Sequence, residues 1–556
     1  MTTLHMRILT SLLILMLVGC SNDRYPDLII VDTKILTVDQ NNSVAEAIAV
    51  KDGVIIAVGN SEEIKSLAGS STKVLSFKQQ VLVPGFIAAH EHPTLTAVFA
   101  DTIDLSGFTF QSSKPMWQHL KQQVAQADKG DWIYAMGLDQ VLMPDLILPD
   151  KQFLDEIAPN NPLVIVSQTM HSFWANSLAF EQAGISRDTL DPGNGSYYAR
   201  DQQGELNGFI AESDAASPLL AELKSPLAVV GRYQQTLQSL VEAGFTSVAS
   251  AGFNIPPMAA RYASSDWFEP RIRQFVYLTE DELEHLPDSP SQDNEFYQIL
   301  GIKLWHDGSP YTGTMALEEP YLHNPITQAM GISEGHKGAP RLSQESFNKL
   351  ITEFHHAGWQ LAVHSQGDYS NELAAETFEK LLGSRSNEQR HRFEHCLLVK
   401  QQTLASFKRL GISPSFHINH ILYYGDALSE KIIGEQRAQN VLPVKTAFEL
   451  GLHPTLHADS PMFPADPISL MKTAVMRQTL SGKILGGEQA LTPQQALRTV
   501  TINGAWQLNM ETHIGSFEIG KKADFTLLSG DLYSLDPTQW DNIQVNQVWL
   551  AGERKY

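Results

Sequence analysis

The stretch Val81-Leu-Val-Pro-Gly-Phe-Ile-Ala-Ala-His90-Glu-His92 decides the fold. It is an apolar run rich in β-strand formers, which predicts a strand, and it ends in His-x-His. Alternate side chains of a strand point to the same face, so His90 and His92 would lie side by side. Two neighbouring imidazoles can bind one metal ion, and His is a common zinc ligand. On this motif alone, a pair of ordinary surface or core histidines is the alternative.

Strand-like and helical segments alternate through the middle of the chain. Helical patterns, such as those at 344–356 and 369–382, lie between several of the predicted strands. This alternation predicts a parallel sheet, and eight strands predict a closed (β/α)8 TIM-like barrel of the α/β class. The eight predicted strands are 82–92, 246–250, 273–278, 300–305, 360–364, 392–395, 412–417 and 453–458.

Both ends of the chain outside this region are predicted to be all-β. Residues 21–83 and 506–556 contain short strand-like runs separated by Gly turns. Each segment is too short to bury a core by itself, so we predict one β-sandwich domain built from both termini. The barrel would then occupy residues 84–505. Within it, residues 94–235 are too long for one barrel connection and predict an insertion over the barrel mouth.

The overall composition excludes some partners. The 556 residues are 43% hydrophobic and 18% charged, as in an ordinary globular protein with room for a large core. A net charge of -22 argues against binding nucleic acid or anionic lipid through a basic face. The two cysteines, Cys20 and Cys396, cannot form a disulfide framework.

The first twenty residues predict a signal peptide. Arg7 precedes a short apolar run, which is too short for a comfortable transmembrane span. Leu17-Val-Gly-Cys20 resembles the lipobox of bacterial lipoproteins. That resemblance implies cleavage before Cys20, a lipid on its thiol and attachment to the bacterial cell envelope. Ser21 then implies the outer membrane, facing the periplasm. A plain secretory signal, or a cytoplasmic protein with an apolar start, is the alternative.

Groups that bind metals or move protons end several of the predicted strands. In a barrel, functional side chains lie at the C-terminal strand ends. Each of these residues alone has an ordinary explanation, such as a helix cap or a hydrogen bond in the core. Their joint placement predicts one shared site. They are His90, His92, Lys303 with Asp307 after it, His364, His395, and His457 with Asp459 after it.

As a set, the motifs resemble the amidohydrolase superfamily, in particular its YtcJ-like or N-substituted formamide deformylase-like branch. The resemblance runs from about Asp27 to the C-terminus. The motifs include Pro84-Gly-Phe-Ile-Ala-Ala-His-Glu-His92, His171-Ser-Phe-Trp-Ala-Asn-Ser177, Gly301-Ile-Lys-Leu-Trp-His-Asp-Gly308, His364-Ser-Gln-Gly-Asp368, Phe393-Glu-His395, Ala458-Asp-Ser-Pro461 and Gly520-Lys-Lys-Ala-Asp524.

The resemblance implies metal-dependent hydrolysis of a small molecule, usually at a C–N bond. By position, His90 and His92 match the first metal pair, and His364 and His395 match the ligands of a second metal. The cofactor would be one or two Zn ions or other divalent metals. The remaining matches are Lys303, which in two-metal members carries CO2 as a bridging carbamate, Asp459, the catalytic aspartate and a metal ligand, and His171 and Trp174, in a part that faces substrate.

The chain departs from the family pattern at three positions. Ala88 and Ser250 stand where Asp is usual, and His417 stands where a Gln is common before the later His420. Loss of the Asp before His-x-His affects the orientation of the metal ligands and the metal affinity. Two alternatives to C–N hydrolysis stay open: isomerisation or ester cleavage at the same site, and a non-catalytic metal- or ligand-binding lipoprotein. The substrate and a possible homodimer are not readable from the sequence.

Overall fold

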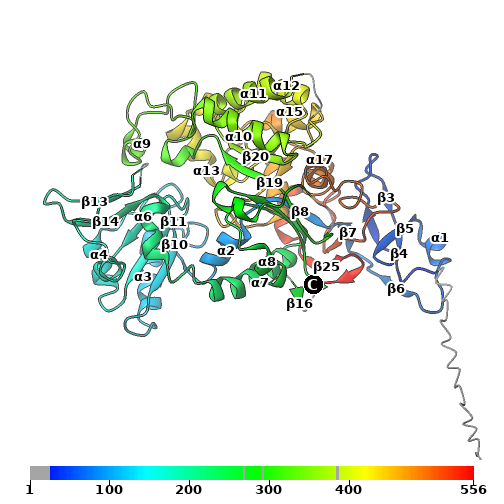
Figure 1. Ribbon diagram of the computed structural model, residues 1–556. Helices are drawn as coiled ribbons and strands as arrows, with labels where there is room; N and C mark the ends of the chain where they lie inside the picture. Colours follow the sequence, from blue (N-terminus) through cyan, green and yellow to red (C-terminus); the bar gives the residue numbers. More distant parts are fainter. Residues whose placement is uncertain (1–24, 194–195, 264, 267–268, 291–293, 384–386) are drawn as a thin grey trace, which may run out of the picture.

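The computed structural model describes residues 25–193, 196–263, 265–266, 269–290, 294–383 and 387–556 (Figure 1). The predicted signal peptide and the lipidation site at Cys20 lie outside these residues. Within the described part, every helix is too short or too polar to cross a bilayer.

Eight strands form one parallel sheet at the centre of the molecule (Figure 1), which confirms the predicted TIM-like barrel. Each predicted strand has a counterpart in this sheet. Across the closing seam, the His92 amide donates to the Ser460 carbonyl at 3.2 Å. In spatial order the strands are β8 (Phe86–Glu91), β15 (Phe245–Ala251), β18 (Arg273–Leu278), β19 (Tyr297–Trp305), β20 (Gln360–Ser365), β21 (Arg392–His395), β22 (Ser413–Phe416) and β23 (Thr455–Leu456).

The first predicted strand is divided between two sheets. Residues Val81–Pro84 form β7 in a terminal sheet, and the barrel strand β8 begins only at Phe86. Pro84 has no amide hydrogen for a continuous ladder. Gly85 lies so close to β15 that a Cβ there would be 2.2 Å from Thr246 Oγ1. The prediction of one continuous strand was therefore wrong, because a Pro-Gly step allows the chain to pass from one sheet to the other.

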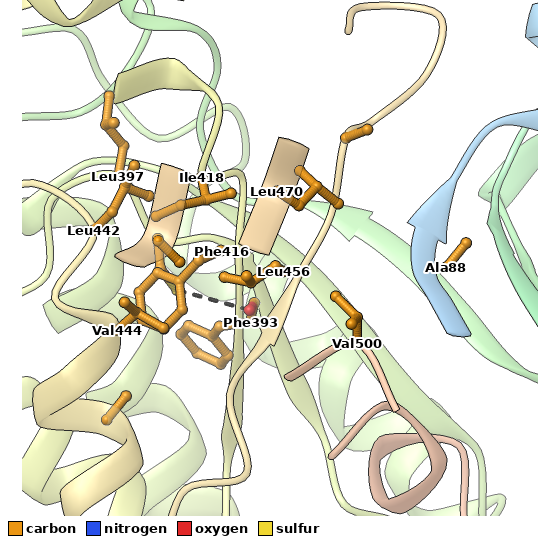
Figure 2. Close-up of a cluster of buried hydrophobic side chains, with 14 of the residues drawn as sticks. Ala88, Phe393, Leu397, Phe416, Ile418, Leu442, Val444, Leu456, Leu470 and Val500 are labelled. Carbon is orange, nitrogen blue, oxygen red and sulfur yellow. Dashed lines mark hydrogen bonds between the residues drawn. The ribbon is translucent and has the colours of Figure 1, made fainter. Parts of the chain in front are cut away.

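Helices surround the barrel strands, and the hydrophobic core lies between the two layers. Phe393 of β21 packs on Phe407 of α12 (Gln401–Leu410) with ring centroids 4.6 Å apart. Figure 2 shows Phe393, Phe416 and Leu456 from three neighbouring strands in one buried cluster. Because strand side chains alternate, the residues between them face the barrel interior. The main surrounding helices are α2 (Pro93–Phe99), α7 (Pro226–Glu242), α10 (Gln344–His356), α11 (Asp368–Leu382), α12 (Gln401–Leu410), α13 (His420–Ala427), α15 (Val444–Glu449), α16 (Pro467–Met476), α17 (Pro493–Thr499) and α18 (Ile502–Gln507).

Two further sheets are built from the ends of the chain. Apolar side chains of both, including Ile30, Ile48, Phe525 and Trp549, form one core. Arg273 of the barrel reaches this domain and pairs with Asp524 at 2.7 Å, and both side chains are buried. One sheet holds β5 (Val54–Gly59), β4 (Ala47–Lys51), β1 (Leu28–Val31) and β6 (Lys73–Ser76); the other holds β26 (Glu553–Arg554), β25 (Val545–Leu550), β24 (Phe525–Leu528), β7, β2 (Lys34–Leu36) and β3 (Val44–Ala45).

The insertion has its own six-stranded sheet and its own cores, and it lies on the opposite side of the barrel from the terminal sheets (Figure 1). It touches the barrel near the end of β23, where Gln168 donates to the Met462 carbonyl at 2.6 Å. Its strands, in spatial order, are β13 (Tyr197–Arg200), β14 (Leu206–Ala211), β12 (Ser172–Ala175), β11 (Leu163–Ser167), β10 (Ile133–Leu138) and β9 (Ile103–Asp104), with α3 (Ser113–Val124), α4 (Lys151–Ile157), α5 (Ser177–Gln182) and α6 (Glu212–Ala216).

Candidate metal centre and active site

The His-x-His pair meets Asp459 at the C-terminal end of the barrel. One carboxylate oxygen of Asp459, Oδ1, lies 3.3 Å from His90 Nε2 and 3.0 Å from His92 Nε2. Asp459 follows β23 with φ 58°, so the backbone turns into the left-handed region where the strand ends. Burial alone would raise the pKa of this carboxyl, but the surrounding histidines hold it well below its usual range. Asp459 is therefore an anion beside two imidazoles.

Lys303 of β19 joins this group from the side. Its Nζ lies 3.2 Å from His90 Nε2, and the side chain is buried. Burial lowers the pKa of Lys303 to about 8, although the carboxylates of Glu394 and Asp459 oppose this effect. A larger fraction of this amine is therefore uncharged near neutral pH than for an ordinary lysine.

His364 and His395 approach from the next two strands. Their rings have centroids 4.4 Å apart, and His395 Nδ1 lies 3.8 Å from Asp459 Oδ2. Burial lowers the pKa of both imidazoles well below the usual value, so both are neutral. His364 Nε2 lies 3.3 Å from the Gly308 carbonyl and 3.7 Å from Asp307. His364 thus lies at the edge of the cluster.

Two histidines not predicted as ligands, His417 and His457, lie inside the same cluster. His457 Nε2 is 3.1 Å from His395 Nδ1, and His417 Nδ1 is 3.8 Å from Asp459 Oδ2. Among the described residues, ligand atoms of two trios lie within 4.8 Å of one another: His395, His417 and His457, and His90, His395 and Asp459. His364 is in neither trio. The sequence already placed His457 among the groups at the strand ends, but not as a ligand; the overlooked signal was that His417 directly follows the seventh strand.

A buried ion pair orients His90 from inside the barrel. His90 Nδ1 donates to Glu394 Oε2 at 2.6 Å, and Arg392 Nη2 donates to the same oxygen at 3.0 Å. Burial would raise the pKa of Glu394, but Arg392 and His90 outweigh it and lower the pKa to about 2. The carboxylate therefore keeps the proton of His90 on Nδ1 and leaves the Nε2 lone pair for the cluster.

Glu91, between the two histidines of the opening motif, fixes Asp459. Its carboxylate accepts from the backbone amides of Ala458 and Ser460, at 3.2 and 2.6 Å. Burial raises the pKa of Glu91 to about 7, in spite of these hydrogen bonds. The side chain thus couples the first and last strands of the barrel at the site.

The donor set fits a divalent metal ion. Buried polar atoms normally have hydrogen-bond partners, yet Nδ1 of His92 and Nδ1 of His417 have none among the described residues. Neutral imidazoles together with one carboxylate are the ligand types that zinc prefers. Ala88, where Asp is usual, packs in the hydrophobic cluster behind the strands (Figure 2). That departure therefore lies outside the histidine cluster.

Trp174 and His171, the two residues predicted to face substrate, both lie in the insertion. Trp174 of β12 is buried in the core of the insertion, edge-on to Phe209 at 5.8 Å. The position of Trp174 therefore gives no support for contact with substrate; its packing is that of a core residue. His171 is half-exposed and pairs with Glu212 at 2.9 Å, both within the insertion.

Comparisons with known proteins identify the family of the chain. Residues 73–556 match the model of the Amidohydrolase family. The chain is 25% identical to the N-substituted formamide deformylase of Arthrobacter pascens, over 95% of this chain and 98% of that protein. It is 26% identical to the putative amidohydrolase YtcJ of Bacillus subtilis, over 94% and 98%. An uncharacterized metal-dependent hydrolase from Pyrococcus horikoshii has the same fold, with a TM-score of 0.73 and 24% identity over 92% of this chain and 99% of that one. The chain belongs to the amidohydrolase family.

Proposed function

We propose that this protein is a metal-dependent hydrolase that cleaves a C–N bond of an amide, a formamide or a related small molecule. The observation that carries the proposal is the position of Asp459, an ionised carboxylate 3.0 to 3.8 Å from four imidazoles, those of His90, His92, His395 and His417. The similarity to a protein named N-substituted formamide deformylase supports the choice of bond.

The residues that would hold the metal come from separate strands. A bound divalent ion supplies Lewis acidity, which lowers the pKa of a water towards about 7 and polarises a carbonyl. The imidazole-rich set favours Zn, as one or two ions. The proposed ligands are His90, His92, Lys303, His364, His395 and Asp459, to which the geometry adds His417 and His457 as candidates.

Asp459 would move the proton in this reaction. Its low pKa keeps it ionised at neutral pH, so Oδ1 or Oδ2 can accept a proton from the attacking water. As the new C–O bond forms and the C–N bond breaks, the same proton passes to the leaving nitrogen. Glu91 and Glu394 touch no substrate in this scheme, and they hold Asp459 and His90 in place.

Lys303 is proposed to carry a carbamate. The neutral amine attacks CO2, a new C–N bond forms, and the proton lost from the nitrogen goes to solvent. The resulting anionic oxygens can bind cations, whereas an ammonium group at the same position would repel them. The lowered pKa of Lys303 supports this modification because it makes the free amine available near pH 8.

The central test is Asp459→Asn in the full-length protein loaded with Zn. We expect wild type to turn over members of an amide and formamide panel, and the variant to lose at least about 100-fold in kcat, since general acid–base catalysis contributes about 10²–10⁴-fold. Asp188→Asn, at a side chain 91% exposed, is the matched control. Wild type that holds metal, turns over no amide and is unaffected by Asp459→Asn would instead be a binding protein. Turnover of esters or isomerisable substrates alone would assign the other chemistry.

We also propose that the protein is anchored to the bacterial cell envelope through a lipid on Cys20, as an outer-membrane lipoprotein facing the periplasm. The proposal rests on the Leu17-Val-Gly-Cys20 sequence and on Ser21. An acidic chain with this anchor would meet small-molecule substrates in the periplasm and would not bind nucleic acid.

A further inference from the structure

A large apolar side chain stands exposed beside the metal-binding histidines. Phe253, in the loop after β15, is 47% exposed, and its ring centroid lies 5.6 Å from that of His92. Its φ of 59° is in the left-handed region, which is unusual for a bulky residue. An exposed phenyl group on a strained backbone is unfavourable by itself, and such features cluster at functional sites.

The loop is held in this shape by partly buried polar contacts. Ser250 Oγ donates to Asn254 Oδ1 at 2.6 Å, and Asn254 Nδ2 donates to the Tyr277 carbonyl at 2.9 Å and to Glu282 at 3.0 Å. The backbone N–H of Asn254 also donates to Glu282. These bonds fix the residue next to Phe253 from two sides. Ser250, where the family usually has Asp, thus helps to hold Asn254 in place.

A second aromatic ring, that of Trp305, lies next to Phe253. Trp305 ends β19, and its ring centroid lies 5.8 Å from that of Phe253, with the planes inclined by 58°. The ring is only partly buried, and Lys303 Nζ lies 5.4 Å from its centroid. The two rings therefore contact each other, and they border the cluster at two points: Phe253 at His92 and Trp305 at Lys303.

We propose that Phe253 and Trp305 form an apolar subsite that receives an aromatic or branched aliphatic substituent of the substrate. This inference rests on the proposed C–N hydrolysis and names the class of its substrates. Such a substituent would gain apolar burial and edge or offset contacts with the two rings. A methyl group in its place would leave both rings exposed to water. Ser250 and Asn254 are positioning residues that hold Phe253 against His92.

The test compares matched amides that carry either a benzyl or a methyl group, with one series varied on the nitrogen and another on the acyl carbon. In one of these series, we expect the benzyl-to-methyl ratio of kcat/KM to fall about 10- to 100-fold in Phe253→Ala, the discrimination that an apolar pocket typically supplies. Phe253→Leu should retain an intermediate ratio. In Phe253→Ala, kcat/KM for the methyl substrate should fall by a smaller factor than kcat/KM for the benzyl substrate. Ile519→Ala, an exposed apolar residue in the terminal sheet domain, is the control.

Asn254→Ala tests the positioning part separately. We expect it to lower the benzyl-to-methyl ratio in the direction of Phe253→Ala, with an unchanged metal content, although the phenyl ring is still present. A benzyl-to-methyl ratio that stays unchanged in Phe253→Ala in both series, because neither substrate or both substrates lose kcat/KM equally, would overturn the subsite.

Calorimetry separates this inference from the proposed function. N-benzylacetamide, its acyl-side counterpart N-methyl-2-phenylacetamide and N-methylacetamide are titrated into Zn-loaded wild type and Phe253→Ala. Tighter binding of one benzyl ligand than of N-methylacetamide to wild type, lost in the variant, supports the subsite even if no amide is hydrolysed, in which case only the proposed reaction fails. Equal binding of all three ligands to wild type overturns the subsite even if amides are hydrolysed.

Discussion

Glu91 and Asp459 are coupled through the backbone: the carboxylate of Glu91 accepts the amides on both sides of Asp459, from Ala458 and Ser460. Glu91 belongs to the first barrel strand, and Asp459 follows the last. The residue between the two histidines of the opening motif therefore fixes the proposed proton carrier, which lies 368 positions away in the chain (459 minus 91). A single side chain thus fixes the seam of the barrel and the geometry of the site.

Replacing Glu91 by Gln should damage the site without unfolding the protein. Gln has the same shape, but its amide nitrogen would face a backbone N–H instead of accepting it. We expect metal affinity or kcat to fall about 10- to 100-fold, as for other groups that orient ligands. Metal titration and kinetics on an amide that wild type hydrolyses provide the measurement. Glu372→Gln, at a partly exposed carboxylate that pairs with Lys400, is the control, and equal values for Glu91→Gln and wild type would contradict the coupling.

Lys303→Ala should remove one metal equivalent per chain if Lys303 bridges two ions. The amine lies 3.2 Å from His90 Nε2, so its loss leaves a gap in the ligand set. Elemental analysis of the purified protein measures the ratio of metal to chain, and mass spectrometry can detect the added CO2. Lys472 pairs with the exposed Asp541, and Lys472→Ala is the control for the loss of a positive charge. Unchanged stoichiometry would refute the bridge.

Asp524→Ala should loosen the joint between the barrel and the terminal sheets. Asp524 pairs with the fully buried Arg273 and also accepts the Ala551 amide. Removing one partner of a buried pair costs about 3–5 kcal/mol, because the other charge stays buried. Glu295, 2.7 Å from Arg273 Nη1, remains as a partner and places the expected loss at the lower end of this range. Urea unfolding should show this loss in the free energy of unfolding. Glu553→Ala removes an exposed ion pair with Lys555 and should cost at most about 1 kcal/mol. A similar small cost at Asp524 would argue against the joint.

His391 should make the protein less stable in acid. Its Nδ1 accepts the Leu361 amide at 3.0 Å, and burial lowers its pKa to about 3. Between pH 6.5 and 3 the unfolded chain binds a proton that the folded one does not, so stability falls as pH decreases. From pH 7.5 to 5.5 this residue should account for about 1 kcal/mol. Urea unfolding of His391→Gln should show a weaker pH dependence by that amount, and equal slopes would contradict the assignment.

Cys20→Ser tests the proposed anchor. With a lipid on the thiol, the full-length protein expressed in a Gram-negative host should sediment with the outer membrane. The variant cannot be acylated there, and it should appear in a soluble fraction or keep its signal peptide. Fractionation followed by mass spectrometry of the N-terminal peptide distinguishes these results. Cys396→Ser, at the buried second cysteine, is the control. An unlipidated wild-type protein in the periplasm would indicate a plain secretory signal instead.

The sequence by itself determined the barrel and many members of the histidine cluster. Each barrel strand is a local pattern of apolar residues, and His90, His92, Lys303 and His395 stand at strand ends that a parallel barrel must bring together. Such patterns are readable because strand periodicity depends on neighbours a few positions apart.

Only the tertiary structure decided the remaining features, because each depends on contacts between residues distant in the chain. The division of the opening stretch at Gly85 follows from its contact with Thr246. The addition of His417 to the cluster and the contact of His457 with His395 follow from the register of the last strands, and the burial of Trp174 from the packing of the insertion. The position of Phe253 beside His92 depends on a loop held by Asn254 and Glu282. No local period encodes these contacts, since they form only when distant segments pack together.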